Sequence, residues 1–184
     1  MEEINRFTRS PLKAEEVYTF SIILCDNEID RDFERFSMDA LEVLAQLFIG
    51  KTGIMDHEPK TENQAARIYR TKVEKDSSRV TSVGEPYCML KADAYMLRSP
   101  KNEEFIAEIE AGIKKEVSIG CSVRSCTCSI CGKDLRRGEC THQKGQSYQV
   151  NGTTMICHGI LDEPTDAYEW SFVAIPAQKN AGVY

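Results

Sequence analysis

The segment around Ser118 could present a nucleophile on an open strand surface. The run KEVSIGCSV is β-like, and in a strand alternate side chains point to opposite faces. The larger apolar residues share one face, while the small residues Ser118, Gly120 and Ser122 share the other. A substrate backbone could approach the Ser118 hydroxyl over that shallow face. A serine on an ordinary solvated strand gives the same alternation, so the pattern alone favours catalysis only modestly.

A serine hydroxyl needs a base to remove its proton as it attacks, and His57 is the candidate. The chain has three histidines; His142 lies among cysteines and His158 lies in a β-like run. His57 lies in a loop directly after the first expected helix, where a catalytic imidazole is often held. A surface histidine paired with Asp56 or Glu58 is the alternative interpretation.

A carboxylate is needed to fix the histidine tautomer and to stabilise the imidazolium. Glu169 is the first choice because its strand is otherwise apolar, and a buried carboxylate there needs a partner. Asp166 and Asp162 are competing choices, and a charged residue on a solvated face is the alternative. Backbone amides near Gly120 or the side chain of Arg124 could stabilise the oxyanion.

The cysteines gather mainly in one segment, which predicts a metal site rather than a disulfide framework. Cys128-x2-Cys131 is followed by Cys140-x-His142, which gives a Cys3His set. Gly132, directly after the first pair, suits the sharp turn of a zinc knuckle. All four positions are filled by protein, so we expect structural Zn. Such an ion would stiffen an inserted hairpin beside the candidate catalytic group, because the segment has little apolar content of its own.

Other assignments of the cysteines stay open. Cys126 and Cys157 are spare sulfurs that could replace Cys140 or His142 as ligands. Free thiols in a reducing compartment, or redox-active cysteines, are the alternatives to a metal site.

Cysteines outside this cluster are better interpreted as small buried hydrophobic residues, namely Cys25, Cys88 and Cys121. A cysteine nucleophile at Cys121 or Cys88 is poorly supported, since Cys121 lies on the strand face opposite to Ser118.

The elements that must position these residues are mostly strands with two amphipathic helices. Ser37 caps the first expected helix, and Ser99-Pro100 is expected to start the second, with Ser99 as the cap. Strands are expected at 17–24, within 65–97, at 115–123 and in the two runs 153–161 and 167–177. This order predicts an α+β fold with a mostly antiparallel β-barrel flanked by helices. Residues 126–147 are expected as a small zinc-knuckle insertion in a single domain, 1–184.

Composition excludes several classes of protein. With 184 residues, 41% hydrophobic and 28% charged, the chain is typical of one globular domain. The net charge of -6 argues against a general nucleic-acid binder. No long apolar run or signal-peptide pattern is present, so we expect no membrane partner and a cytosolic protein.

Three stretches resemble one known family, in matching order. They are the histidine loop GIMDHEP, the run IKKEVSIGCSV, and the final run YEWSFVAIPAQKNAGV. Together they resemble the prohead (capsid maturation) serine proteases of tailed phages, which are related in fold to the herpesvirus maturation proteases. The resemblance maps a catalytic Ser-His dyad onto Ser118 and His57, with Glu169 as the third member, and implies a β-barrel wrapped by helices.

The resemblance implies a serine endopeptidase acting through an acyl-enzyme. Its expected substrates are the scaffold and major capsid proteins inside the assembling procapsid, in the host cytoplasm, and we expect a homo-oligomer. A catalytically inactive prophage structural or scaffold protein with a structural zinc site is the alternative. A third hypothesis makes the zinc knuckle the functional centre of a binding adaptor.

Overall fold

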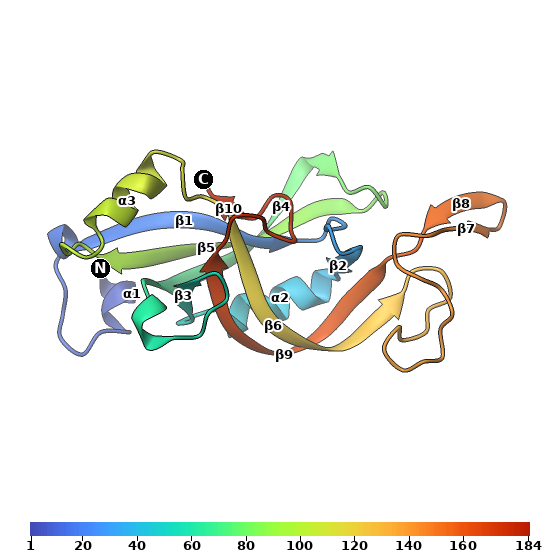
Figure 1. Cartoon of the computed structure of the whole chain (residues 1–184), viewed down its shortest axis with the longest axis horizontal. Coiled ribbons are helices and arrows are strands. Elements are labelled where there is room, and N and C mark those ends of the chain that lie inside the picture. Colours follow the sequence, from blue (N-terminus) through green and yellow to red (C-terminus); the bar gives the residue numbers. More distant parts are fainter.

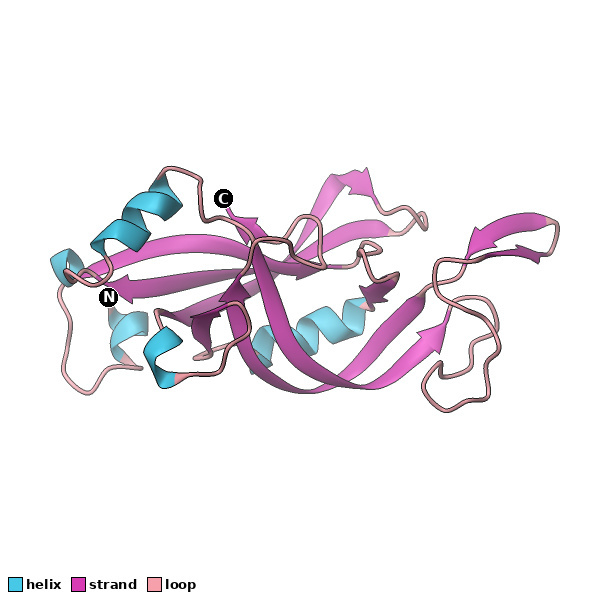
Figure 2. Cartoon of the chain, viewed as in Figure 1, coloured by secondary structure: helices cyan, strands magenta, loops and turns pink.

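Strands dominate the computed structural model, which describes all 184 residues (Figure 2). The helices are short: α1 (Glu2–Asn5), α2 (Met38–Leu47) and α3 (Glu103–Glu110). The strands are β1 (Val17–Asp26), β2 (Glu34–Phe36), β3 (Thr52–Met55), β4 (Ala66–Val80), β5 (Pro86–Leu97), β6 (Val117–Cys128), β7 (Ser147–Val150), β8 (Thr153–Ile156), β9 (Gly159–Phe172) and β10 (Gly182–Val183). The predicted α+β class is confirmed.

The main sheet is mixed and open. Its strands follow the order β10-β1-β5-β4-β3-β9-β2, with β6 also paired to β9. Most pairs are antiparallel, but β9 runs parallel to both β2 and β3. The prediction of a closed β-barrel is therefore wrong. Only one isolated bridge, Glu116 to Gly182, joins the start of β6 to β10. Along its length β6 pairs with β9 instead (Figure 1).

A long curved ribbon of β6 and β9 crosses the molecule (Figure 1). Ser118 faces Ser171 and Gly120 faces Glu169 near its start, and Cys128 faces Gly159 at its far end. Residues 129–158 connect the two strands at that far end and include the separate β7–β8 hairpin. The first three residues of the expected 126–147 insertion belong to β6.

The predicted helix after Ser37 is confirmed as α2. The Ser37 side chain accepts a hydrogen bond from the Ala40 amide at 3.0 Å and so caps the helix. Leu41 and Leu44 are fully buried on one face, and α2 packs against β9, β4 and β5. The helix leads directly into β3 and so places the loop that carries His57.

The second helix starts later than expected. Its first residue is Glu103 with Asn102 at the N-cap, and the Ser99 side chain does not cap it. Instead the Ser99 carbonyl accepts hydrogen bonds from the amides of Asn102 and Glu103, so Ser99 and Pro100 form a turn before the helix. None of the helices is long and apolar enough to span a membrane.

Trp170 fixes β9 against its neighbours in the core. It is fully buried, and its ring contacts those of Phe20 and Phe172. A Cβ at Gly53 would overlap the Trp170 ring, so only glycine lets β3 approach β9 this closely. The close pairing brings the end of β3, and the following loop, next to the end of β9.

Candidate functional site

His57 and Glu169 are in direct contact. His57 Nδ1 lies 2.8 Å from Glu169 Oε1, and the Glu169 side chain is only 12% exposed against 42% for His57. A carboxylate can only accept a hydrogen bond when ionised, so this contact places the imidazole proton on Nδ1. The lone pair of Nε2 is then available for a proton, as a general base requires.

The loop that carries His57 has an unusual backbone. Asp56 and His57 both adopt left-handed conformations, with φ of 51° and 55°. This conformation costs free energy for residues other than glycine, so other contacts must hold it. The Asp56 amide donates to the Phe172 carbonyl at 3.0 Å, and the Glu58 amide donates to the Met55 carbonyl at 2.9 Å. The loop is thus tied to the end of β9.

Ser171 joins the histidine loop to the carboxylate. Its Oγ donates to Glu169 Oε2 at 2.6 Å and accepts from the His57 amide at 3.1 Å. Ser171 is fully buried. Its hydroxyl is therefore a positioning group rather than a free nucleophile. The sequence signal for Ser171 was the alternation of β9, which puts Ser171 on the same face as Glu169. The contact between Ser171 and His57 is visible only in the folded chain.

Ser118 lies on the same face, one strand away. It is directly opposite Ser171 in the β6–β9 register, and such pairs have Cβ atoms about 5 Å apart. Ser118 is half-buried. No hydrogen bond joins it to His57, whose only side-chain hydrogen bond goes to Glu169. The fold therefore brings all three predicted residues to one face and connects two of them directly.

Gly120 makes room for the carboxylate. It lies opposite Glu169, and a Cβ at this position would overlap Glu169 Oε1. Any larger residue would move the carboxylate or the strand. The small-residue face predicted from the sequence thus accommodates Glu169, and the half-buried Ser118 lies on the same face.

The competing carboxylates have other partners. Asp162 accepts from the Ser37 hydroxyl at 2.8 Å, and Asp166 lies 3.5 Å from Lys51 Nζ. Neither touches His57. The suggested role of Arg124 as an oxyanion donor is wrong, because it pairs with Glu163 and lies six positions, about 20 Å of strand, beyond Ser118.

Cys121 is not suited to act as a nucleophile. Burial and the nearby negative charge of Glu169 raise the pKa of its thiol to about 11. A thiol is reactive as the thiolate, which such a pKa disfavours near neutral pH. Cys25 and Cys88 are buried in the core, as expected for small hydrophobic residues.

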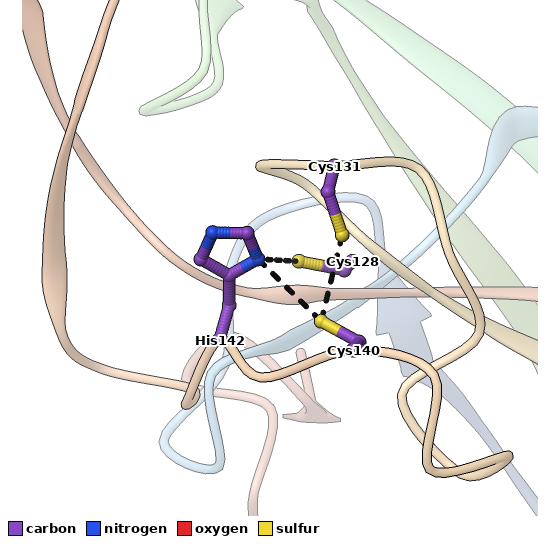
Figure 3. Close-up of side chains that lie close together, drawn as sticks. All are labelled: Cys128, Cys131, Cys140 and His142. Atoms are coloured by element: carbon purple, nitrogen blue, oxygen red, sulfur yellow. Dashed lines mark hydrogen bonds between the residues drawn. The ribbon is translucent and has the colours of Figure 1, made fainter.

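A second group of reactive side chains lies at the far end of the β6–β9 ribbon (Figure 3). The ligand atoms of Cys128, Cys131, Cys140 and His142 all lie within 4.8 Å of one another. Cys131 Sγ lies 3.5 Å from Cys140 Sγ, and His142 Nδ1 lies 3.5 Å and 3.7 Å from the Sγ atoms of Cys140 and Cys128. This cluster, predicted from the sequence, could hold a metal ion.

Local contacts of the backbone and of a neighbouring ring hold the side chains of this cluster in place. The Gly132 amide donates to the Cys128 carbonyl at 2.9 Å, and Gly132 has a φ of 73°, which favours glycine. Burial acts to raise the pKa of Cys128, but backbone amides that donate to its sulfur lower it overall. The Tyr148 ring of β7 packs edge-on against the His142 ring, with 4.6 Å between the two ring centres. The β7–β8 hairpin therefore helps to orient the histidine ligand.

The two spare sulfurs behave differently. Cys157 is fully buried with its Sγ 3.7 Å from that of Cys128. Cys126 Sγ instead lies 3.8 Å from Glu34 Oε1, away from the cluster. Cys157 is thus next to one ligand without belonging to the group of four.

The cysteine cluster is well separated from the serine face, the face of β6 that carries Ser118 and Gly120. Ser118 and Cys128 are ten positions apart in β6, which corresponds to about 33 Å of strand. The expectation that the inserted segment lies beside the catalytic group is therefore wrong. A metal ion here would act on the distal connection rather than on His57.

Comparison with protein-family models, with curated proteins and with solved structures gives no match to this chain.

Proposed function

We propose that this chain is a serine endopeptidase of the capsid-maturation type, with Ser118 as nucleophile, His57 as general base and Glu169 as the orienting carboxylate. The observation that carries the proposal is the 2.8 Å contact between His57 Nδ1 and Glu169 Oε1, on the strand face where Ser118 lies. This contact between two residues distant in sequence supports the proposal, because a general-base histidine is oriented by a carboxylate at its Nδ1 in Ser-His-acid triads. The likeness of the three sequence stretches to prohead proteases agrees with it.

The proposed reaction follows from this geometry. Ser118 Oγ attacks the scissile carbonyl carbon while His57 Nε2 takes the hydroxyl proton. The imidazolium is stabilised by Glu169, and it returns the proton to the leaving amine nitrogen as the C–N bond breaks. Water then attacks the carbonyl carbon of the acyl-enzyme ester while His57 Nε2 takes a proton from it. The proton passes to Ser118 Oγ as the ester C–O bond breaks, which releases the new carboxyl terminus and restores Ser118.

Ser118 must approach His57 for this reaction. In proteins without substrate, catalytic hydrogen bonds are often long and tighten only in the substrate complex. The Ser118 side chain is half-buried and has no hydrogen-bond partner, so no such bond holds its hydroxyl in the present orientation. Substrate binding over this face would complete the contact.

The metal in the distal cluster is proposed to be Zn. Zn–S bonds of about 2.3 Å in a tetrahedron place two sulfurs about 3.8 Å apart, and a sulfur and a nitrogen about 3.6 Å apart. Three of the six distances among the ligand atoms, 3.5, 3.5 and 3.7 Å, are close to those edges, and all six are within 4.8 Å. Four protein ligands leave no open position, so the ion would order residues 129–158 rather than act in catalysis.

The proposed substrates are the scaffold and major capsid proteins of a phage or prophage. Cleavage would occur inside the assembling procapsid in the host cytoplasm, by a homo-oligomeric enzyme. These statements rest on the family resemblance alone.

A fluorophosphonate probe tests the proposal and requires no peptide substrate. Such probes phosphonylate an activated serine and expel fluoride. Peptide mapping by mass spectrometry should locate the label on Ser118 of the full chain. Ser118→Ala should abolish labelling. Ser122→Ala, which removes a hydroxyl from the same face of the same strand, should retain it.

Cleavage can be tested in parallel by producing the chain together with the capsid protein of the same phage genome. Processing should require Ser118. Labelling or processing that persists in Ser118→Ala would refute the assignment of the nucleophile.

A catalytically inactive structural protein is the second candidate. It is favoured by the absence of a Ser118–His57 hydrogen bond. This candidate predicts no probe labelling at any serine, together with tight metal binding by the distal cluster.

A further inference from the structure

A cavity adjoins the proposed catalytic group. It has a volume of about 470 Å³ and opens where β3 and β9 end and β6 begins. Met55, Ile113 and Phe172 contribute apolar walls, and Asp56, Lys114 and Glu116 contribute charge. The cavity is large enough for a long amino-acid side chain.

The lining residues are neighbours of the catalytic group in the chain. Asp56 directly precedes His57, whereas Phe172 follows Ser171 at the end of β9 and points to the opposite face of that strand. Glu116 lies two positions before Ser118 and is held in place by the Val173 amide, which donates to its carbonyl at 3.1 Å. Because Glu116 and Ser118 are alternate residues where β6 begins and share one side, a peptide whose scissile bond lies over Ser118 could extend a neighbouring side chain past Glu116 into the cavity.

The charges of the cavity are not balanced. Lys114 Nζ lies 2.9 Å from Glu108 Oε2 and also 5.1 Å from the Phe105 ring centre, so its charge has partners. Asp56 and Glu116 form no ion pair with any side chain. Two uncompensated carboxylates therefore accompany apolar walls, and Ile113 remains 70% exposed at the surface.

We propose that this cavity receives a lysine or arginine side chain of the peptide substrate, an inference that rests on the proposed endopeptidase activity. Long basic side chains bury an apolar stem while the charged end stays near anionic partners. The stem would contact Met55, Ile113 and Phe172, and the cationic end would pair with Asp56 or Glu116. The enzyme would thus select bonds close to a basic residue.

Matched peptides measure the charge preference directly. Short synthetic peptides carrying lysine are compared with peptides carrying norleucine, which keeps the stem and lacks the ammonium group. Lysine should raise kcat/KM by about tenfold, the effect of one charge-assisted contact. In Glu116→Gln or Asp56→Asn the lysine-to-norleucine ratio should fall towards one. Asparagine tolerates the left-handed backbone of position 56, so the second variant should fold.

Charge reversal gives a sharper result. Glu116→Lys should prefer peptides with glutamate over those with lysine. Glu104→Gln is the matched control, because Glu104 is an exposed carboxylate of α3 outside the cavity. It should leave the lysine-to-norleucine ratio of the wild type intact.

Binding to Ser118→Ala separates this inference from the proposed activity. Fluorescence anisotropy should show tighter binding of the lysine peptide than of the norleucine peptide, with the difference lost in Ser118→Ala/Glu116→Gln. Cleavage by the wild type with equal preference for lysine, norleucine and leucine overturns the cavity assignment and leaves the endopeptidase standing. A lysine preference in binding, with no cleavage by the wild type, supports the cavity and overturns the endopeptidase. If the protein shows no lysine preference in binding and does not cleave the peptides, both the cavity assignment and the endopeptidase are overturned.

Discussion

At the scale of single residues, the environment of Glu169 makes it the partner of His57. Its carboxylate is nearly buried and has two hydrogen-bond partners, His57 and Ser171. A buried carboxylate without such partners would be costly. Gly120 provides the space that the carboxylate occupies. The catalytic proposal therefore depends on three neighbours of Glu169 as much as on the carboxylate itself.

Replacing Glu169 by glutamine should lower the rate of probe labelling at Ser118 by about 10²- to 10⁴-fold. The amide no longer stabilises an imidazolium and can favour the wrong tautomer. Glu163→Gln is the control, since Glu163 is an exposed carboxylate on the same strand. Equal labelling rates in the two variants would contradict the role of Glu169, provided that circular dichroism shows both to be folded.

Gly120→Ala should reduce labelling at least tenfold and lower the free energy of unfolding by about 1–3 kcal/mol. The added methyl overlaps Glu169 Oε1, so either the carboxylate or β6 must move. Urea unfolding and labelling kinetics measure the two effects. Ser122→Ala changes a small residue on the same face and should alter neither strongly. Wild-type behaviour of Gly120→Ala would show that this close approach does not position Glu169.

At the scale of elements, the β6–β9 ribbon carries two chemically different groups. Ser118 lies near the start of this ribbon, and the cysteine cluster lies at its far end, where Cys128 ends β6. The distal connection has few buried apolar residues, so ligand bonds to a metal ion would replace a core there. Each end can therefore be disrupted separately.

If the cysteine cluster binds zinc as proposed, removing that ion should loosen residues 129–158 while leaving the serine face intact. A chelator, or Cys140→Ser, should abolish bound zinc and increase amide hydrogen exchange in this segment. Labelling at Ser118 should change by less than about twofold, since about 33 Å of strand intervenes. Cys126→Ala is the control and should retain the ion, because Cys126 lies beside Glu34. Zinc content measured by mass spectrometry decides the ligand set.

At the scale of the whole molecule, a buried polar network ties the chain terminus to the sheet. Asp26 at the end of β1 is 1% exposed and accepts hydrogen bonds from Tyr87 Oη at 2.7 Å and from Asn180 Nδ2 at 2.8 Å. Its amide donates to Gln178 Oε1 at 3.0 Å. The segment after β9 is thereby fixed beside β1, where β10 pairs.

Asp26→Ala should lower the free energy of unfolding by about 2–4 kcal/mol. The change leaves the buried hydroxyl of Tyr87 and the half-buried amide of Asn180 without an acceptor, and unpaired buried groups are costly. Chemical denaturation followed by fluorescence of Trp170 measures the loss. Glu42→Ala, at an exposed carboxylate of α2, should change stability by less than about 0.5 kcal/mol. A small effect of Asp26→Ala would mean that the terminus is held by other contacts.

The sequence by itself determined the local features of this protein. Alternation around Ser118 predicted β6 and its two faces, and Ser37 predicted the start of α2. The spacing from Cys128 to His142 predicted the metal cluster, since knuckle ligands lie close together along the chain. Such features depend on neighbouring residues, and so they can be recognised without a fold.

Only the tertiary structure decided the long-range features. The sequence left Asp162, Asp166 and Glu169 as candidates, and the β9 register brought Glu169 alone to His57. The tertiary structure also decided that the sheet is open, that the cysteine cluster lies far from Ser118, and that Ser171 contacts His57. These outcomes depend on how strands distant in sequence pair, and a one-residue shift in register would turn each side chain to the other face.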